Sequence, residues 1–388
     1  MAKTPLNLAP GIVKDDTPTS QEGRWIDGDK VRFERGRPQK IGGWQKFLDS
    51  PLVGICRSMK AWRTFDDYRR LAFATSKKLY EHHYGVTTDI TPLDVLKSGT
   101  LTDPFATTAG SSTVTVTHTA HGQKTGDWVL LDAPAAVGGL VIKGPYKITV
   151  TNANEYTFTH EGKATSSDTG GGSVSYEYFR AALGSDPFET TAGSAVVTVA
   201  HVNHGRSVGD YVHFDGATAV GGITIDGEYT VTEKINSDTY TITHSSAATS
   251  SATGGGSCVN VQYEIPIGYD DQILGYGWGV GPYGMGTYGT PRDSKGVPTL
   301  APRTWTLDNY GEVLVACPRS GRIYEWDRNR GGRALPMLGA PRSAAAILVT
   351  EERFILALGA DGDLMKIAWP DQDDRYNWTA SDLTTAGD

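Results

Sequence analysis

The 388-residue chain has only three cysteines, Cys56, Cys258 and Cys317, and they lie far apart. An odd number without any CxxC pair excludes a disulfide framework and a cysteine-based zinc motif. No run of about 18 apolar residues occurs, and the N-terminus lacks the apolar stretch of a secretory signal. We therefore expect no membrane-spanning segment, assembly in a cytoplasm, and three cysteines that serve as small buried residues.

Positive charge is in short supply. Lys and Arg number 36 against 44 Asp and Glu, which gives a formal net charge of -8. This balance excludes a protein that wraps nucleic acid with a broad basic face, because such binding rests on many contacts to phosphates. It leaves open a protein that surrounds a duplex without holding it.

The motifs of common catalytic sites are also absent. The sequence contains no Gly-x-Ser-x-Gly elbow, HExxH, P-loop or kinase set. The carboxylate pairs Asp66-Asp67 and Asp373-Asp374 are adjacent, so on a strand their side chains point to opposite faces. A glycan hydrolase would need two carboxylates facing each other across a cleft, and nothing in the sequence indicates them. We expect no enzyme activity, no catalytic residues and no cofactor.

Glycine is abundant, with 47 residues, and runs rich in Thr, Val and Tyr alternate with turn residues. This composition favours strands. A long repeat is visible, because Asp103–Ser111 returns as Asp186–Ser194, 83 positions later. Further matched segments are His121-Gly122 with His204-Gly205, Gly126–Val129 with Gly209–Val212, Val137–Gly139 with Val220–Gly222, Tyr156–His160 with Tyr240–His244, and Gly170–Ser173 with Gly254–Ser257. Two tandem copies of one small module follow.

Each copy has the pattern of five or six short strands. Val114–His118 alternates Val with Thr, so one face is apolar and the other carries hydroxyls. Trp128–Leu131, Tyr146–Val150 and Tyr156–Thr159 repeat this pattern. We expect each module to close into a small β-barrel or sandwich.

The flanking segments have a different signature, an apolar strand, a polar turn and a second short strand. It occurs in residues 70–80, 311–326 and 353–365. Consecutive propeller blades have this pattern. The fold class is therefore predicted as all-β, a β-propeller-like platform with the two modules inserted between blades. Three blades are fewer than the four that a propeller usually needs, so three alternatives stay open: weakly patterned segments complete the ring, the natural polypeptide continues, or the flanks form a different β-fold.

The predicted organisation has five parts along the chain. They are residues 1–100, an N-terminal segment and the first blade-like part; 101–183, the first module; 184–264, the second module; 265–300, a loop rich in Gly and aromatic residues; and 301–388, further blade-like strands.

Six of the nine histidines occupy equivalent positions in the two copies. They are His118, His121 and His160 in the first, and His201, His204 and His244 in the second. Three imidazoles could hold zinc if strands brought them together. Residues three apart on a strand point to opposite faces, however, and duplication explains the recurrence without a ligand role. We favour a turn-capping role for His121 before Gly122, and expect no metal.

Two further segments have partial motifs of binding sites. The run Gly275–Gly289 has GxGxxG-like spacings, but no helix follows to form a phosphate cradle, and no Lys or Arg lies in it. Asp361–Asp363 looks like part of a calcium loop but is flanked by strands, which favours a turn. We expect interaction through exposed aromatic residues of the first run and through the N-terminal segment. The candidate interaction residues are Tyr276, Trp278, Tyr283, Tyr288, Trp25 and Arg32.

Charges of alternating sign mark the N-terminal segment from Arg24 to Lys40 and predict a solvated strand pair, with contact to an acidic partner or DNA as the alternative.

The N-terminal sequence resembles the start of tail nozzle proteins (tail tubular or hub proteins) of short-tailed bacteriophages. The resemblance lies in Pro5–Ile12, Gly23–Phe33 and Pro38–Trp44, and the Gly277–Gly279 run is similar to that family too. The modules resemble small β-domains that decorate phage tail and fibre proteins.

The resemblance implies a virion structural protein of the tail that assembles in the host cytoplasm. Such nozzles form a homo-oligomeric ring, usually of six copies, below the head–tail adaptor. They enclose the exit channel for double-stranded DNA without sequence-specific binding and dock fibres or spikes. The alternative is a tail-associated adhesion protein whose tandem modules bind host glycan or fibre proteins, where two copies would add avidity.

Overall fold

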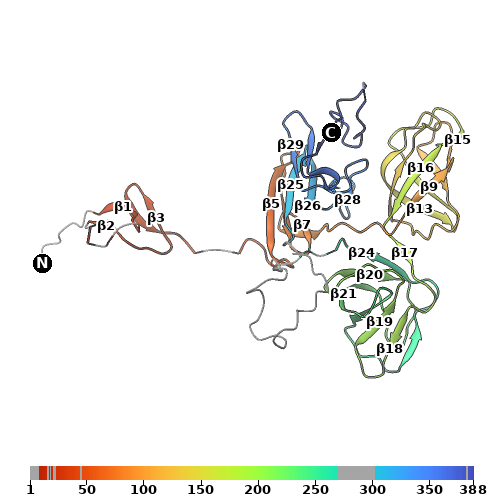
Figure 1. Cartoon of the computed structure of the whole chain (residues 1–388), viewed down its shortest axis with the longest axis horizontal. Helices are drawn as coiled ribbons and strands as arrows, with labels where there is room; N and C mark the ends of the chain where they lie inside the picture. The colour runs from red at the N-terminus through yellow and green to blue at the C-terminus, as the bar shows by residue number, and fades with distance from the viewer. Residues whose placement is uncertain are drawn as a thin grey trace, which may run out of the picture. The chain divides into compact units, whose positions relative to one another are not determined.

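The computed structural model describes residues 8–14, 17, 19–20, 23–43, 46–266, 268, 302–381 and 383–388. The chain divides into two compact units, Met1–Pro51 and Leu52–Asp388. The described residues form strands and one short 3₁₀ turn, η1 (Ala360–Gly362), so the fold is all-β, as predicted (Figure 1). No helix among the described residues is long and apolar enough to cross a membrane.

The N-terminal unit consists of two small strand pairs. β1 (Ala9–Ile12) pairs with β2 (Arg24–Trp25) in parallel, and β3 (Val31–Glu34) forms a hairpin with β4 (Arg37–Lys40). Arg35 and Gly36 in the hairpin turn have positive φ values of 50° and 76°, which a tight two-residue turn requires. Along β3, half-buried Val31 and Phe33 alternate with exposed charged residues, as the alternating charges predict.

Three small antiparallel sheets make up what we call the platform, and we name them blades 1, 2 and 3. Each follows the chain order of its strands. Blade 1 contains β5 (Cys56–Arg63), β6 (Arg69–Thr75), β7 (Leu79–His83) and β8 (Val86–Asp89). Blade 2 contains β25 (Trp305–Tyr310), β26 (Val313–Pro318), β27 (Tyr324–Trp326) and β28 (Leu335–Pro336). Blade 3 contains β29 (Ala346–Val349), β30 (Ile355–Leu358) and β31 (Ile367–Ala368).

The first strands of the blades lie next to one another, because β25 contacts both β5 and β29. In a propeller, the first strand of each blade lies near the centre and the later strands follow outward in chain order. The three sheets have this arrangement. Trp62 of blade 1 packs in one cluster with Trp305 and Leu314 of blade 2. Val315, from the opposite face of β26, packs with Ile347 of blade 3. Blade 2 is thus covered on both faces, and all six residues of β26 are buried.

Each module is one curled eight-stranded sheet. The first contains β9 (Lys97–Thr102), β10 (Phe105–Thr107), β11 (Thr113–Thr117), β12 (Trp128–Asp132), β13 (Lys143–Asn152), β14 (Glu155–Thr159), β15 (Asp168–Gly170) and β16 (Ser173–Tyr178). The second contains β17 (Ala181–Ala182), β18 (Phe188–Thr190), β19 (Val196–Ala200), β20 (Tyr211–Asp215), β21 (Gly227–Lys234), β22 (Thr239–Thr243), β23 (Ala252–Gly254) and β24 (Asn260–Tyr263).

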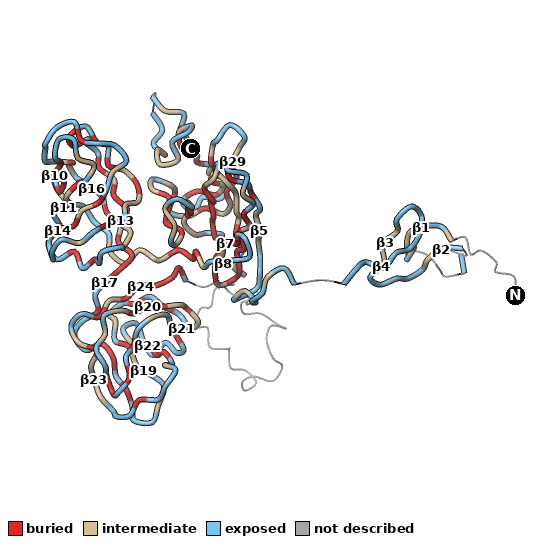
Figure 2. Tube along the Cα trace, turned by 180° about the vertical axis from the view of Figure 1, so that it is seen from behind, coloured by how far each residue is buried: buried red, intermediate tan, exposed pale blue. Residues whose placement is uncertain are grey.

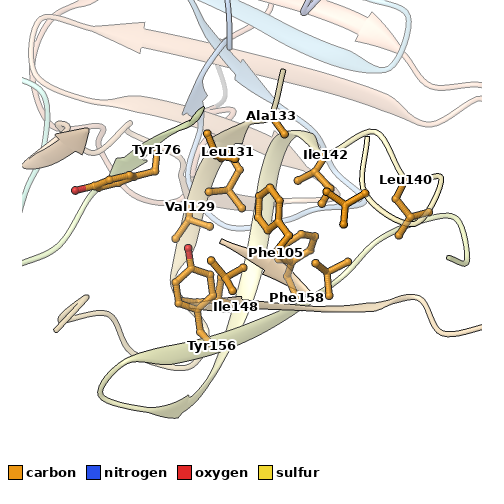
Figure 3. Packing of buried hydrophobic residues seen from close by; sticks show 14 of the residues in the cluster. Phe105, Val129, Leu131, Ala133, Leu140, Ile142, Ile148, Tyr156, Phe158 and Tyr176 are labelled. Atoms are coloured by element: carbon orange, nitrogen blue, oxygen red, sulfur yellow. The ribbon is translucent and has the colours of Figure 1, made fainter. Parts of the chain in front are cut away.

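Strand order is the same in both modules, so the sequence repeat is a repeat of topology. The long strand β13 pairs with β12 through its first half and with β14 through its second half, which folds the sheet onto itself. The apolar faces enclose a core that includes Phe105, Leu131, Ile148 and Phe158 (Figure 3). The buried residues follow the strands inside each module, while the connecting turns are exposed (Figure 2).

The modules are inserted between blades, as predicted. The chain leaves the platform after β8, the last strand of blade 1, and returns to β25, the first strand of blade 2. The two connecting segments lie side by side. Leu93 and Glu264 form an antiparallel bridge, Asp94 N donates to Tyr263 O at 2.7 Å, and Ile265 N donates to Pro92 O at 3.1 Å.

Two details differ from the sequence expectations. Cys56 and Cys258 are exposed, because Cys56 begins an edge strand and Cys258 precedes β24 in a turn; only Cys317 is buried. In blade 3, β30 is not followed at once by a second strand. Asp361 and Gly362 lie in the 3₁₀ turn and Asp363 caps its C-terminal end, while Leu364 and Met365 are 78% and 90% exposed. The turn expected at Asp361–Asp363 is confirmed.

Candidate functional site

The candidate interaction residues fall into two groups. Tyr276, Trp278, Tyr283 and Tyr288 lie outside the described residues. Trp25 is half-buried on β2, with its ring 6.2 Å from that of Phe33. Arg32 is exposed on β3 and donates to Glu34 at 3.2 Å. The structure therefore places Trp25 and Arg32 in one small unit, and the role of all six residues stays a prediction.

The repeated histidines are engaged inside the modules. Nδ1 of His118 lies 2.7 Å from the hydroxyl of Tyr178, which in turn lies 2.9 Å from that of Tyr156. In the second module, His201 and Tyr263 repeat the contact at 2.6 Å. Burial lowers the pKa of His118 and of His201 to about 4, so both rings are neutral near neutral pH.

The other repeated histidines hold turns. Nδ1 of His121 accepts a hydrogen bond from Gln123 N at 3.0 Å, and its Nε2 lies 3.0 Å from Asn152 O. His204 makes the same two contacts in the second module. His160 likewise accepts from Gly162 N at 2.9 Å. The turn-capping role expected for His121 is confirmed, and duplication accounts for the recurrence.

A dense group of charged side chains joins the platform to the second module, and we call it the ionic junction. Lys78, in the turn between β6 and β7, is 3% exposed. Its Nζ donates to Glu264 at 2.7 Å, to Asp89 at 3.0 Å and to Glu228 at 3.1 Å. It also lies 4.0 Å from the centroid of the Tyr211 ring. One buried ammonium thus connects blade 1 with strands β20 and β21 and with the end of β24.

Blade 2 enters the junction through Arg333, which precedes β28. Its guanidinium donates to Glu264 at 2.7 Å, and its Nη2 lies 3.2 Å from Nε2 of His213. The same Nε2 lies 3.1 Å from Glu228. Glu264 is 1% exposed and receives both cations, so it is the central anion of the junction.

The electrostatics of the junction follow from these contacts. Burial opposes the charge of Lys78, but attraction by Glu264 and Asp89 outweighs it and raises the pKa of Lys78. Hydrogen bonding to His213 is the main reason that the pKa of Glu228 falls to about 2, with Lys78 adding to the shift against the effect of burial. Burial raises the pKa of Glu264, against the attraction of Arg333 and Lys78.

His213, Glu228 and Glu264 also place their ligand atoms within 4.8 Å of one another, as a metal site would. The two amino-acid cations already contact these groups. Lys78 donates to both carboxylates, and Arg333 lies against His213 and Glu264. A metal ion would have to displace both cations or share the space with them, at a Coulombic cost. The geometry is that of an ion-pair network.

Further ion pairs fix the first module. Arg180, in the link between the modules, donates to Asp127 at 2.7 Å and also pairs with Asp215 of the second module. Arg322 of blade 2 donates to Glu177 of β16 at 2.9 Å. Charged side chains therefore connect the first module with both the second module and the platform.

Sequence reasoning did not find the ionic junction. Its members are separated by up to 255 positions, from Lys78 to Arg333, so no local motif joins them. One signal was available. Glu264 stands between Tyr263 and Ile265, and a carboxylate inside an apolar strand segment needs a buried partner.

The second module also carries an open concavity of about 560 Å³ on its outer surface, beside the ionic junction. It is lined by Asp226, Glu228, Tyr229, Thr230, Thr232, Thr243, His244 and Ser245. The rings of Tyr229 and His244 stack at 6.1 Å, and Tyr146 and His160 repeat this stack at 6.2 Å in the first module. An aromatic pair among hydroxyls and carboxylates has the chemistry to bind a polar ligand with an apolar face.

The comparisons with known proteins add little to this picture. No family model and no curated protein matches the chain. Among solved structures, the phage phi92 endosialidase matches with a TM-score of 0.20 and 13% identity, over 89% of this chain and 50% of that chain. The chain thus spans about half the length of that protein. So low a structural similarity transfers neither fold nor activity.

We predict that Glu264→Leu lowers the free energy of unfolding by about 3 kcal/mol, because it leaves Lys78 and Arg333 without their shared anion. The double variant Lys78→Met, Glu264→Leu should lose less than the sum of the single variants, with a coupling of at least about 1 kcal/mol. Chemical denaturation measures both. Glu189→Leu, at an exposed position of β18, is the matched control and should change stability by less than about 0.5 kcal/mol. Strict additivity would contradict the junction.

The modules should lose stability as the pH falls from about 6.5 to about 4. In this range the unfolded chain binds protons on His118 and His201 that the folded chain excludes, since their folded pKa lies near 4. We expect a loss on the order of 2 kcal/mol for each module, measured by urea unfolding at about pH 7 and about pH 4.5. The double variant His118→Gln, His201→Gln should flatten this dependence, and an unchanged slope would refute the assignment.

Proposed function

We propose that this chain is a virion structural protein without enzymatic activity, the subunit of a ring-forming nozzle or hub of a short phage tail. In this role, about six copies surround the DNA exit channel below the head–tail adaptor. The main support is the propeller-like platform, whose inserted modules begin after the outermost strand of a blade. The N-terminal segment that precedes the platform resembles the start of nozzle proteins. The localisation is the virion tail, with assembly in the host cytoplasm.

The charge of the chain supports this role. A channel that passes double-stranded DNA must not retain it, and an acidic protein with a net charge of -8 repels phosphates. The cations of the ionic junction do not oppose this, because Lys78 and Arg333 are already paired with carboxylates. DNA would slide past such a surface without sequence-specific contact.

The position of the modules supports a docking role. They follow β8, the outermost strand of blade 1, so they belong to the periphery of the platform rather than to its inner strands. Ion pairs from Lys78, Arg333 and Arg322 hold them there. In the proposed ring, the modules and the N-terminal unit provide surfaces for fibres or spikes and for the adaptor.

A second candidate is an adhesion protein whose tandem modules bind host glycan. The concavity around Tyr229 and His244 favours it, because sugars stack their apolar faces on aromatic rings and hydrogen-bond to hydroxyls and carboxylates. The repeated Tyr146–His160 stack would supply a second, linked contact and thereby avidity.

We predict that the purified chain, mixed with its head–tail adaptor, forms rings with a central opening in negative-stain electron microscopy. Class averages should show rotational symmetry close to sixfold. The chain without adaptor and the adaptor alone are the reference samples. Class averages without any ring, at protein concentrations where the two proteins co-elute, would contradict the nozzle proposal.

Replacing residues 96–262 by two glycines separates the two candidates. The platform should fold without the modules, because Leu93 and Glu264 lie side by side and a short linker can join their segments. In phage carrying this deletion, intact tails that fail to adsorb to host cells would favour adhesion. Missing tails would favour a structural role for the modules themselves. Tyr229→Ala in the full chain, which spares the junction, should weaken adsorption alone if the concavity binds glycan.

A further inference from the structure

A second cavity, of about 200 Å³, lies where the first module meets the link between the modules and the platform. We call it the Gln123 cavity. Its apolar wall consists of Leu93, Trp128, Phe179 and Leu335. Phe179 and Leu335 are each 2% exposed and belong to one cluster, against which Leu93 and Trp128 pack. The cavity therefore has a wall of fixed side chains that includes two aromatic rings.

Gln123 supplies a hydrogen-bond acceptor at this cavity. Its side chain lines the cavity, and the residue is 6% exposed. Nε2 donates to His121 O at 3.2 Å and to Arg180 O at 3.3 Å, which fixes the orientation of the amide because only its nitrogen can donate. Oε1 is buried and accepts no hydrogen bond from the described residues. A buried acceptor without a donor is unfavourable, so a ligand that brings a donor gains affinity here.

The second module has a counterpart of this site. The pairing of β12 with β16, and of β20 with β24, makes Trp128 correspond to Tyr211 and Phe179 to Glu264. The edge that forms the Gln123 cavity in the first module is therefore the edge that forms the ionic junction in the second. An apolar ring stands in the first module where the second has the central anion.

The counterpart of Gln123 is Arg206. Each residue follows the capping histidine of its module by two positions, and its backbone N–H donates to that ring at 3.0 Å. Nη2 of Arg206 donates to Asp94 at 2.8 Å, while its Nε and Nη1 donate to two backbone carbonyls. Arg206 thus finds all its partners within the protein. The shorter Gln123 retains an acceptor beside a cavity.

The charges around the Gln123 cavity select against charged ligands. Arg180 and Arg333 both line it, so a cation would lie beside two guanidinium groups. These groups are already engaged, Arg180 with Asp127 and Asp215 and Arg333 in the ionic junction. An anion would bring its oxygens against the Asp127 carboxylate and Oε1 of Gln123. A neutral donor meets neither obstacle.

We propose that the Gln123 cavity binds one aromatic ring that carries a neutral hydrogen-bond donor, as in a phenol or an indole. The ring packs on Trp128, Phe179 and Leu335, and its O–H or N–H donates to Oε1 of Gln123. The size fits, because apolar cavities of about 150 Å³ in protein cores hold one benzene ring. A free small molecule and the Tyr or Trp side chain of a protein segment both bring this group. The site does not depend on the nozzle role.

The test compares phenol with toluene, which has the same size and lacks the donor. Each is titrated into the full chain, and the side-chain N–H signal of Trp128 is followed by NMR. Phenol should bind at least about fivefold more tightly, as one hydrogen bond provides. Gln123→Leu should remove this preference by weakening phenol binding at least about fivefold, with toluene affinity within about twofold of wild type. Gln39→Leu, the same change at an exposed position, is the control and should alter neither affinity.

A second variant keeps the test valid if Gln123→Leu does not fold, as checked by circular dichroism. Leu93→Phe adds atoms to the cavity wall at a half-buried position and should weaken phenol and toluene alike, at least about fivefold. Unchanged phenol affinity in this variant, or no saturable phenol binding by the wild-type chain, would overturn the proposal. So would an equal loss of phenol and toluene in Gln123→Leu.

The blocked amino acid N-acetyltyrosinamide separates the two sources of the ring. If it binds as well as phenol, the cavity has room for a peptide backbone at its mouth, and a protein side chain is the ligand. Binding of phenol alone assigns the site to a free small molecule. Either result supports a site for a neutral aromatic donor.

Discussion

A sheet that is apolar on both faces has to be covered on both faces, and the platform follows from this constraint. Strand β26 is buried at every position because blade 1 lies on one side of it and blade 3 on the other. The inner strands β5, β25 and β29 come together for the same reason.

The modules satisfy the constraint in another way. Each curls one sheet around its own core, so its outer face can be polar. The chain of His118, Tyr178 and Tyr156, repeated in the second module, shows that even polar groups inside find internal partners. The first module is attached to the platform by both kinds of contact, because Leu130 and Phe179 pack with Leu335 of blade 2 and ion pairs join the same parts. Buried ion pairs fix how the module is oriented on the platform, because any other orientation would leave a buried charge without its partner, at a cost of several kcal/mol.

Much of the fold could be predicted because its signals are local. Alternation in Val114–His118 and the repeat at 83 positions gave the modules, and the strand–turn–strand signature gave three blades. The ionic junction could not be predicted, since Lys78, Glu228 and Arg333 come together only after blades and modules have folded. The exposure of Cys56 and Cys258 could not be predicted. The sequence indicates that a residue lies in a strand or turn, but not whether that strand or turn lies at the edge of a sheet. For the run Gly275–Gly289, the composition predicts an interaction through its aromatic residues but does not indicate the binding partner.

The insertion also has a consequence for the order of folding. Lys60 of blade 1 pairs with Asp308 of blade 2, 248 positions further along the chain. Closing so long a loop is slow when the chain between is unfolded. The strand pairings inside each module join residues at most 81 positions apart, as for Lys97 with Tyr178, so the modules can fold first. Once folded, they bring Asp94 and Tyr263 into hydrogen-bond contact, which shortens the loop that the Lys60–Asp308 pair has to close. During synthesis, blade 1 emerges first. The face that packs on blade 2 stays uncovered until the modules have folded and blade 2 has been synthesised.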